Sequence, residues 1–484
     1  MDQISRLERT ARQLEPDAAD RETLFNQVVE YAQRHLAGLA EAPAYVGRDD
    51  NGRALLDAPI AEDGISMDEA LALLHDNVDT VGINAASGRF LGYIPGGGLP
   101  HAALGDLLAA LSNRYASVFF AGPGAARMEN MLTRWMASIV GYPASSAGFL
   151  ASGGSIANLS AIVTARDVFD IAGAAVEQAV VYQTEHTHHC IDKALRVAGV
   201  GRCIQRMVPV DDRYRMVPEA LEEAIAADAG AGLRPWLVVA SAGTTNTGAV
   251  DPMKEVGEIA HAHGLWYHAE GAYGAFFVLC PEGRAILSGM DTSDSLVLDP
   301  HKTLFLPYGT GALLVKDRQK LYDAHKGKAD YMQDALDAVE EVSSAFLSPE
   351  LTKHFRGLRM WLPLKVLGVA PFRAALSEKI HLARYFYEQI QRLDGFEVGP
   401  YPDLSVVTYR YVPPRGDADA FNERLAKSIQ QDGRIFLSST RINGTFVLRL
   451  AVSCFRTHRD DIDLALEILR DKAAEILDFG LGDS

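Results

Sequence analysis

Apolar residues recur every three or four positions near the start of the chain. In the clearest stretch they stand at Leu24, Val28, Val29, Tyr31, Ala32 and Leu36. This spacing places them on one face of a helix, so the pattern predicts packing helices between residue 2 and about residue 85. Residues 41–65 interrupt the pattern, because they are rich in proline, aspartate and glycine and show no clear period. We expect this stretch to be extended and to lie across another part of the protein or a second subunit.

Short apolar runs alternate with amphipathic helical stretches from about residue 180 onward. The apolar runs cover residues 180–182, 236–240, 265–268, 296–298 and 312–315. Helical patterns at 218–227 and 252–263 separate several of them, and each begins at a proline, which suits the first turn of a helix. This alternation is typical of a parallel sheet with helical connections. The pattern therefore predicts an α/β domain.

The pattern changes again after residue 351. A long helical run passes through Trp361, Leu364, Val366 and Phe372. An amphipathic helix follows at 377–393, residues 404–412 and 445–452 alternate like half-buried strands, and 462–477 reads as a closing helix. We expect a small α+β domain here.

These patterns divide the chain into three parts. We expect helices and extended chain over residues 1–88, a large α/β domain over 89–375 and a small C-terminal α+β domain over 376–484. The length of 484 residues is enough for two or three domains with cores of their own.

Composition and charge exclude several classes of protein. Hydrophobic residues make up 48% of the chain and charged residues 23%, which excludes collagen, coiled coils and membrane bundles. Because 46 basic residues face 63 acidic ones without a basic stripe, we expect no nucleic acid partner. Residues 1–15 carry mixed charges with no apolar core behind them, so we expect no secretory signal, no membrane anchor and a cytoplasmic protein. The four cysteines lie far apart, which fits reduced thiols.

A lysine that follows a predicted strand is the most informative candidate for chemistry. Residues 296–309 read Leu-Val-Leu-Asp-Pro-His-Lys-Thr-Leu-Phe-Leu-Pro-Tyr-Gly and place Lys302 between apolar runs. Burial lowers the pKa of an ammonium group and leaves an amine that can attack a carbonyl to form a Schiff base. The same position also suits a strand-end lysine whose amine reaches solvent.

A turn of small residues precedes a predicted helix. Residues 149–160 read Phe-Leu-Ala-Ser-Gly-Gly-Ser-Ile-Ala-Asn-Leu-Ser. Gly153 and Gly154 permit close approach of an anion, Ser155 can cap the helix or donate its hydroxyl, and the helix dipole favours a phosphate. An ordinary structural turn is the alternative, because glycine-rich turns before helices are common.

A carboxylate ends another apolar run. Glu270 precedes Lys302 by about one strand–helix–strand unit, so both can lie at the carboxyl ends of neighbouring strands, where α/β proteins form their sites. A buried acid at such a place needs a cation or a proton-bearing nitrogen. A helix N-cap or a structural ion pair is the alternative.

Three histidines follow the apolar run at 180–182. His186, His188 and His189 are close enough to raise the question of a metal, but no carboxylate or cysteine completes a recognisable zinc signature. We therefore expect no metal and an imidazole that stacks on an aromatic ring.

A reactive lysine, a phosphate turn, an acid for a ring nitrogen and a stacking imidazole are together what pyridoxal phosphate needs. With them the sequence resembles the group II pyridoxal-phosphate-dependent decarboxylases, which include aromatic amino-acid, histidine and glutamate decarboxylases. The resemblance runs from about residue 90 to residue 452, and its most specific motif is Asp299-Pro-His-Lys. It implies an aspartate aminotransferase-like fold (fold type I) with a mainly parallel sheet in the large domain. It also implies pyridoxal 5'-phosphate as cofactor and a homodimer with shared active sites.

The resemblance implies how the cofactor is held. Lys302 carries it as a Schiff base, and His301, beside it, contacts the phosphate. Gly154 and Ser155 complete the phosphate site.

The same resemblance implies which residues surround the cofactor ring. His188 stacks on one face of the ring and assists protonation, and Ala272 packs against the other face. Thr245 lies near the ring, and Glu270 faces the ring nitrogen. Lys302, His188 and Glu270 are then the catalytic residues.

The substrate is expected to meet four further residues. Arg449 matches a family arginine that can hold the substrate carboxylate by bidentate hydrogen bonds, with a structural ion pair as the alternative. Tyr93 and Pro95 match the segment that lines the substrate pocket, and Phe346 lies nearby. Because these pocket residues are largely apolar or aromatic, an aromatic amino acid is the expected substrate, with an acidic one as the alternative.

Two positions depart from the family pattern. Most members have His-x-Asp-Ala-Ala-Tyr-Gly where this chain has His268-Ala-Glu-Gly-Ala-Tyr-Gly. The extra methylene of Glu270 moves the carboxylate by roughly 1 Å unless the backbone retreats, which Gly271 permits. The second departure lies in the loop over residues 326–351. There Ser344 stands where many aromatic amino-acid decarboxylases have a tyrosine that protonates the carbanion. Tyr331 is a substitute proton donor if the loop folds differently.

The resemblance implies decarboxylation of an L-amino acid to the amine and carbon dioxide. Loss of the loop tyrosine leaves oxidative deamination to an aldehyde as one alternative, and a catalytically weakened cofactor-binding homologue with Glu270 is another. An aminotransferase or a carbon–sulfur lyase of the same fold also remains open, since the fold does not determine the reaction.

Overall fold

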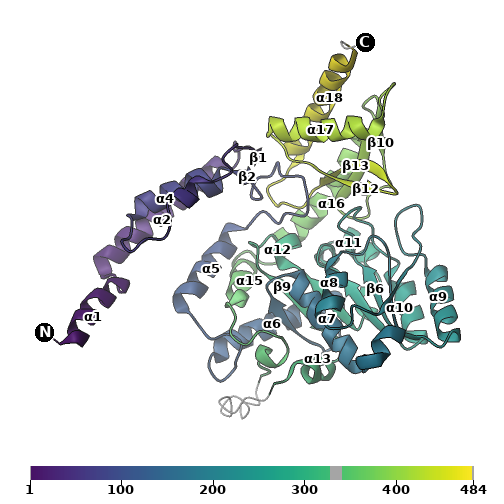
Figure 1. Cartoon of the computed structure of the whole chain (residues 1–484), viewed down its shortest axis with the longest axis horizontal. Coiled ribbons are helices and arrows are strands. Elements are labelled where there is room, and N and C mark those ends of the chain that lie inside the picture. Colours follow the sequence, from purple (N-terminus) through teal and green to yellow (C-terminus); the bar gives the residue numbers. More distant parts are fainter. Residues whose placement is uncertain (1, 328–340, 482–484) are drawn as a thin grey trace.

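The computed structural model describes residues 2–327 and 341–481 (Figure 1). An N-terminal arm projects from the body of the molecule. Its helices are α1 (Gln3–Ala11), α2 (Ala18–Gly38), α3 (Ala54–Asp57) and α4 (Met67–Leu74). Two short strands, β1 (Tyr45–Val46) and β2 (Gly82–Ile83), pair antiparallel where the arm meets the body.

The stretch at 41–65 lies partly across the small domain of the same chain. The N–H groups of Ala44 and Tyr45 both donate to the carbonyl of Gly433, at 2.9 and 3.2 Å. The stretch is extended there, as expected, but it also contains the short helix α3, which the absence of a period did not indicate.

A mainly parallel sheet forms the core of the large domain, which confirms the predicted fold class. Within the described residues it has seven strands in the order β3-β9-β8-β7-β6-β4-β5. They are β3 (Ala147–Ala151), β4 (Ala179–Gln183), β5 (Ile204–Met207), β6 (Arg234–Ser241), β7 (Trp266–Glu270), β8 (Ser295–Leu298) and β9 (Gly311–Val315). Only β9 runs against its neighbours β3 and β8.

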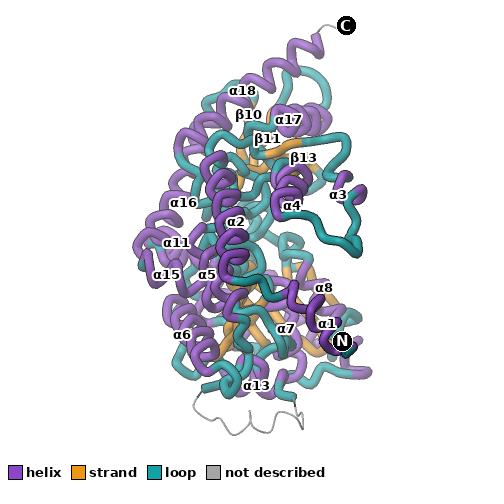
Figure 2. Tube along the Cα trace, turned by 90° about the vertical axis from the view of Figure 1, so that its left-hand side faces the viewer, coloured by secondary structure: helices purple, strands orange, loops and turns teal. Residues whose placement is uncertain are grey.

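Helices cover both faces of this sheet, so that strands lie inside and helices outside (Figure 2). One core includes side chains of α6 (Pro123–Val140), α9 (Pro218–Gly230) and α10 (Met253–Ala262). The other includes side chains of α7 (Gly154–Val168), α8 (Cys190–Val197) and α13 (Arg318–His325). Along β6, Val238 belongs to the first core and its neighbours Leu237 and Val239 to the second, because successive side chains in a strand point to opposite faces. This burial on both faces explains why the strands read as continuous apolar runs.

Further helices belong to the large domain. Among them are α5 (Pro100–Ser112), α11 (Pro281–Ile286) and α15 (Arg356–Leu367). The helical run predicted through Trp361 and Phe372 is in fact divided at Gly368, which ends α15 with a φ of 71°. The left-handed region is open to glycine, so the chain turns there and begins α16 (Ala370–Ile390).

The small domain is an antiparallel sheet covered by helices, as predicted. The order of its strands is β10-β11-β13-β12. They are β10 (Phe396–Val398), β11 (Val406–Tyr411), β12 (Ser438–Ile442) and β13 (Thr445–Ala451). A separate core joins this sheet to α16, α17 (Ala418–Asp432) and α18 (Arg459–Leu481). The domain boundary placed at residue 375 falls inside α16, and the three-part division stays a prediction.

Among the described residues, every helix is too short or too polar to span a bilayer. All four cysteines are buried and unbridged. Cytoplasmic residence stays a prediction.

A buried ion pair anchors β3, the strand that leads into the glycine turn. Nζ of Lys353 lies 2.5 Å from Oε1 of Glu129 in α6 and 3.3 Å from the carbonyl oxygen of Leu150. The same Glu129 oxygen accepts a 2.9 Å hydrogen bond from the N–H of Leu150. The two charges thus satisfy each other and the backbone of the strand.

We expect Lys353→Met to lower the free energy of unfolding by about 3–5 kcal/mol, because it leaves the Glu129 charge buried and uncompensated. The double variant Lys353→Met/Glu129→Gln keeps an acceptor for Leu150 and buries no charge, so it should be more stable than the single variant. Urea unfolding followed by circular dichroism measures both. If Lys353→Met were as stable as the wild type, the ion pair between Lys353 and Glu129 would not stabilise the fold.

Candidate active site

Four strands bring the predicted site residues to one edge of the central sheet. β3, β4, β7 and β8 run in the same direction, and the chain that leaves their carboxyl ends carries the glycine turn, the histidines, Glu270 and Lys302. A cavity of about 310 Å³ lies at this edge. It is lined by Ser152, Gly153, Gly154, Ser155, Ile156, His188, Cys190, Ala272, Asp299, His301 and Lys302. Carboxyl ends of parallel strands are where α/β proteins hold their ligands.

The glycine turn fits a phosphate group. α7 begins at Gly154, and no side chain caps its first N–H groups. A Cβ on Gly154 would lie 2.8 Å from Oδ2 of Asp299 and 3.3 Å from Cβ of Ala272, so a larger residue would fill this end of the cavity. Uncapped N–H groups at a helix N-terminus bind anions. Oδ1 of Asp299 is buried without a hydrogen-bond partner among the described residues, as expected of an atom that faces a ligand.

Lys302 lies in the short helix α12 (Pro300–Thr303), with its Nζ 3.2 Å from Oδ2 of Asp299. Its side chain is 23% exposed, and its amine faces the cavity. Burial acts to lower the pKa of Lys302, but the carboxylates of Asp299 and Glu270 outweigh it and raise the pKa above its ordinary value. The expectation that burial lowers the pKa of Lys302 is therefore wrong for the protein without cofactor, because Asp299 and Glu270 lie close to the amine.

His301 is held by the loop that follows α12. Its Nδ1 lies 2.7 Å from the carbonyl oxygen of Thr310. A carbonyl only accepts, so this nitrogen carries the proton, and Nε2 lies on the side of Asp299, 3.9 Å from Oδ2. Burial lowers the pKa of His301.

Glu270 ends β7 and is buried next to this cavity. Its Oε1 accepts a hydrogen bond of 3.2 Å from the N–H of Ala272, and burial raises its pKa. A Cβ on Gly271 would lie 2.8 Å from Cβ of Ala275 and 2.9 Å from the carbonyl oxygen of Val297. A side chain at position 271 would therefore collide with its neighbours in this backbone, so glycine fits there.

His188 lines the same cavity as Ala272. The N–H of Cys190 donates to Nδ1 of His188 at 3.2 Å, so in the neutral ring the proton is on Nε2. Burial, together with the neighbouring His189 and Lys302, lowers the pKa of His188 to about 4. The ring is therefore neutral near pH 7.

The segment with Tyr93 and Pro95 passes directly over the lysine helix. A Cβ on Gly96 would lie 2.2 Å from the carbonyl oxygen of His301 and 2.9 Å from that of Lys302. Tyr93 has a φ of 48° and a ring that is 55% exposed and lies 6.0 Å from the ring of Phe436. Pro95 is buried.

Arg449 connects β13 of the small domain to the loop after β6. Its Nε donates to the carbonyl of Asn246 at 2.6 Å, and its terminal nitrogens donate to the carbonyl of Thr245 and to Oγ of Ser438. Burial lowers the pKa of Arg449 to about 10. Among the described residues its partners are backbone carbonyls and a hydroxyl, not the carboxylate of a structural ion pair. Thr245, which does not line the cavity, is held at its backbone by this arginine.

The loop candidates lie apart from the cavity. Phe346 belongs to a 3₁₀ turn (Ser344–Phe346) and packs edge-on against Tyr322 of α13, with ring centroids 6.2 Å apart. Ser344 is buried in the same turn, and the N–H of Ala345 donates to the carbonyl of Ser117. Tyr331 lies outside the described residues.

Two residues of the site carried no functional assignment from the sequence. Asp299 precedes Lys302 by three residues, which is the helical spacing that brings two side chains together, so this spacing could have indicated its role. Asn158 stands one helical turn after Gly154, and its side chain acts to lower the pKa of Glu270. The same spacing rule indicates that it faces the cavity side of α7.

Comparison with known proteins agrees with this geometry. The pyridoxal-dependent decarboxylase conserved domain matches residues 51–412. An aromatic-L-amino-acid decarboxylase of Bacillus atrophaeus is 34% identical over 96% of this chain and 97% of its own. A phenylacetaldehyde synthase of Arabidopsis thaliana is 28% identical over 81% of this chain and 83% of its own. The crystal structure of Oryza sativa TDC with PLP and tryptamine superposes with a TM-score of 0.90 at 26% identity, covering 96% of this chain and 99% of that one.

These matches extend over most of this chain and most of each relative, and the family model alone spans well over half of this chain. The resemblance stated from the sequence is confirmed. The protein therefore belongs to the pyridoxal-dependent decarboxylase family and uses pyridoxal phosphate as its cofactor.

Proposed function

We propose that this protein decarboxylates an aromatic L-amino acid to its amine and carbon dioxide. The observation that carries the proposal is the amine of Lys302, which is paired with Asp299 at 3.2 Å and shares a cavity with the glycine turn, His188 and Ala272. The similarity to an aromatic-L-amino-acid decarboxylase over nearly the whole chain supports both the reaction and the substrate class.

Different residues around the cavity would bind different parts of the cofactor. Lys302 would bind it through the amine, and Gly154, Ser155 and His301 would hold its phosphate. When bound, pyridoxal phosphate supplies an electron sink for the electron pair that the departing carboxylate leaves behind. Asp299 keeps a proton on the Lys302 amine.

The groups around the ring have the protonation states that this chemistry needs. Glu270 would provide a carboxylate for the ring nitrogen, and Ala272 would cover one face of the ring. His188 is neutral near pH 7 and carries its proton on Nε2, the nitrogen that is not bonded to Cys190, so it can hold or deliver a proton there.

The substrate side of the cavity is built by the segment at 93–96. Tyr93 is 55% exposed, Pro95 is buried, and Gly96 lies close to the backbone of Lys302. These contacts favour an aromatic side chain. We propose that Arg449 acts by holding Thr245 in place, and that its remaining N–H groups are available for the substrate carboxylate.

Oxidative deamination to an aldehyde is the second candidate. It is favoured by Ser344, which is buried in its turn and places no phenol at the point where the family has its loop tyrosine. In that reaction oxygen accepts two electrons, water supplies the aldehyde oxygen, and the products are the aldehyde, carbon dioxide, ammonia and hydrogen peroxide. The similarity to a phenylacetaldehyde synthase shows that such enzymes exist among its relatives.

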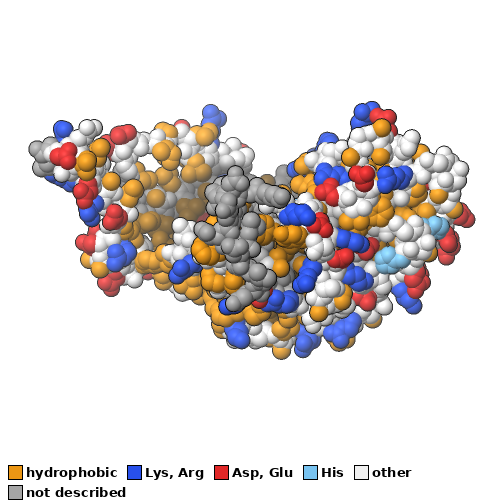
Figure 3. All heavy atoms as spheres, turned by 90° about the horizontal axis from the view of Figure 1, so that it is seen from below, with side chains coloured by type: hydrophobic (Ala, Val, Ile, Leu, Met, Phe, Trp, Pro, Cys, Tyr) orange, Lys and Arg blue, Asp and Glu red, His pale blue; other side chains and the backbone are white. Residues whose placement is uncertain are grey.

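We propose that the working form is a homodimer. Exposed apolar side chains gather along the hollow between the arm and the body (Figure 3). On α2 and α5 they are Phe25, Val28, Val29, Leu36, Leu104, Leu107, Leu108 and Leu111. A second copy that covers these faces would remove their surface from water.

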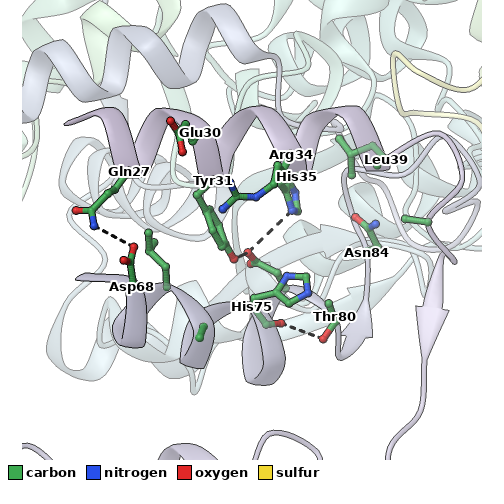
Figure 4. A pocket seen from close by; sticks show the side chains of 15 residues that line it. Gln27, Glu30, Tyr31, Arg34, His35, Leu39, Asp68, His75, Thr80 and Asn84 are labelled. Carbon is green, nitrogen blue, oxygen red and sulfur yellow. Dashed lines mark hydrogen bonds and ion pairs between the residues drawn. The ribbon is translucent and has the colours of Figure 1, made fainter. Parts of the chain in front are cut away.

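The arm itself is loosely packed. A cavity of about 660 Å³ separates α2 from α4, and polar contacts such as Gln27 to Asp68 and Tyr31 to Asp79 bridge it (Figure 4). No residue of α2 or α4 is buried. This supports an arm whose partner is another subunit.

Replacing the lysine tests the proposed function. We expect Lys302→Ala to reduce kcat by more than about a thousandfold and to abolish the visible absorbance of the bound cofactor, because Lys302 carries the only amine among the described residues that line the cavity. Lys193→Ala, an exposed lysine of α8, is the matched control and should keep both. Absorbance spectra and carbon dioxide release measure the effect, and retention of activity in Lys302→Ala would overturn the proposal.

The products separate the two reactions. With an aromatic amino acid in air, we expect carbon dioxide and amine in equal amounts, with no stoichiometric ammonia or peroxide. Product analysis with and without oxygen measures the ratio. If ammonia and peroxide match the carbon dioxide, the aldehyde reaction is the true one.

The dimer is tested by charging its proposed face. Leu108→Glu/Leu111→Glu should shift the protein from dimer toward monomer in analytical ultracentrifugation, because buried charges oppose association. Val197→Glu, at an exposed valine of α8, should leave the dimer intact. A wild-type protein that sediments as a monomer at micromolar concentration contradicts the proposal.

A further inference from the structure

A series of buried, uncharged groups leads to Glu270. Nε1 of Trp266 donates to Oγ of Ser295 at 2.8 Å. Nδ1 of His268 also lies 2.8 Å from this Oγ, and its Nε2 lies 2.7 Å from Oδ1 of Asn158. All four residues are buried, with at most 2% of their surface exposed. They connect β7, β8 and α7 behind the cavity.

The direction of these hydrogen bonds is determined at the Trp266 end. An indole N–H only donates, so Ser295 accepts from Trp266 and has its own O–H to donate to His268. Burial lowers the pKa of His268 to about 3, so the ring is neutral and has one proton. With Nδ1 accepting, that proton is on Nε2 and is donated to Oδ1 of Asn158.

The direction is also determined at the Glu270 end. An ionised carboxylate only accepts, so Asn158 must present its NH₂ group and not its oxygen to Glu270. Nδ2 of Asn158 donates to Sγ of Cys190 at 3.3 Å, which agrees with this orientation, and the Asn158 side chain acts to lower the pKa of Glu270. Both ends therefore require the same orientation of the Asn158 amide.

We propose that Asn158, held in one orientation by His268, Ser295 and Trp266, is a positioning residue that keeps the Glu270 carboxylate ionised and directed at the cofactor's ring nitrogen. This inference rests on the proposed function, because it assigns Glu270 to that nitrogen. It assigns a role to four residues outside the cavity lining: Asn158, His268, Ser295 and Trp266.

Glu270 needs such support in its surroundings. The charged and titratable groups that face it are Lys302 and Asp299 beside α12 and Cys190 of α8. Burial is the largest influence on Glu270 and raises its pKa, Asp299 raises it further, and Lys302 opposes both. When the amine of Lys302 is used to bind the cofactor, the remaining donors are the N–H of Ala272 and the amide of Asn158. The two donors together can hold a glutamate side chain, which has one more rotatable bond than aspartate.

The test follows the ring nitrogen and not the activity alone. Protein loaded with ¹⁵N-labelled pyridoxal phosphate is titrated by NMR as the wild type, Asn158→Ala and Ser160→Ala. Ser160 is the matched control on α7, because its hydroxyl bonds only to the carbonyl of Ile156 in the same helix. We expect the pH at which the ring nitrogen loses its proton to fall by about one to two units in Asn158→Ala, the equivalent of one hydrogen bond to a charge, and to stay unchanged in Ser160→Ala. kcat should fall with little change in KM.

A second measurement needs neither cofactor nor variant. In wild-type protein labelled with ¹⁵N-histidine and free of cofactor, His268 should be the Nε2–H tautomer from pH 5 to pH 8. An Nδ1–H tautomer, or an Asn158→Ala profile equal to that of Ser160→Ala, overturns the inference. Loss of the proposed function is a separate outcome: a wild type that binds the cofactor but releases no carbon dioxide contradicts the function, while the ring nitrogen still reports on Asn158.

Discussion

The ammonium of Lys302 and the carboxylates of Asp299 and Glu270 are buried together at one edge of a parallel sheet, and the rest of the site depends on this arrangement. Each charge alone would be costly to remove from water, and each is tolerable because the others are near. Their grouping follows from topology, because the carboxyl ends of β7 and β8 are adjacent. The cluster explains why Lys302 is protonated in the chain alone although it is largely buried.

The site is also a junction between the two domains. Arg449 reaches from β13 to the carbonyls of Thr245 and Asn246, and the segment around Gly96 lies on the lysine helix. Before it reaches the lysine, this segment pairs with the small domain, since the N–H of Leu91 donates to the carbonyl of Phe436. The large and the small domain therefore both contribute contacts next to the candidate site.

Much of the fold was predictable from local pattern. The runs at 236–240 and 312–315 became β6 and β9 because strands buried on both faces must be apolar throughout. β3 and β5 were not predicted: β3 merges into the small-residue turn, and β5 at the sheet edge is half exposed and contains Gln205 and Arg206. The family motif predicts the residues around the cofactor, and this stays a prediction. The protonation of Lys302 depends on Asp299, three residues away, and on Glu270 in another strand, while Arg449 donates to backbone carbonyls of a loop far away in the sequence.

The central claim is that this cavity holds pyridoxal phosphate on Lys302, and covalent capture tests it most directly. The purified protein is reduced with borohydride in the presence of the cofactor and digested, and the peptides are analysed by mass spectrometry. The account predicts a single pyridoxyl group on the peptide that contains Lys302. A label on another lysine, such as the buried Lys353 or Lys379, or no label at all, would contradict it.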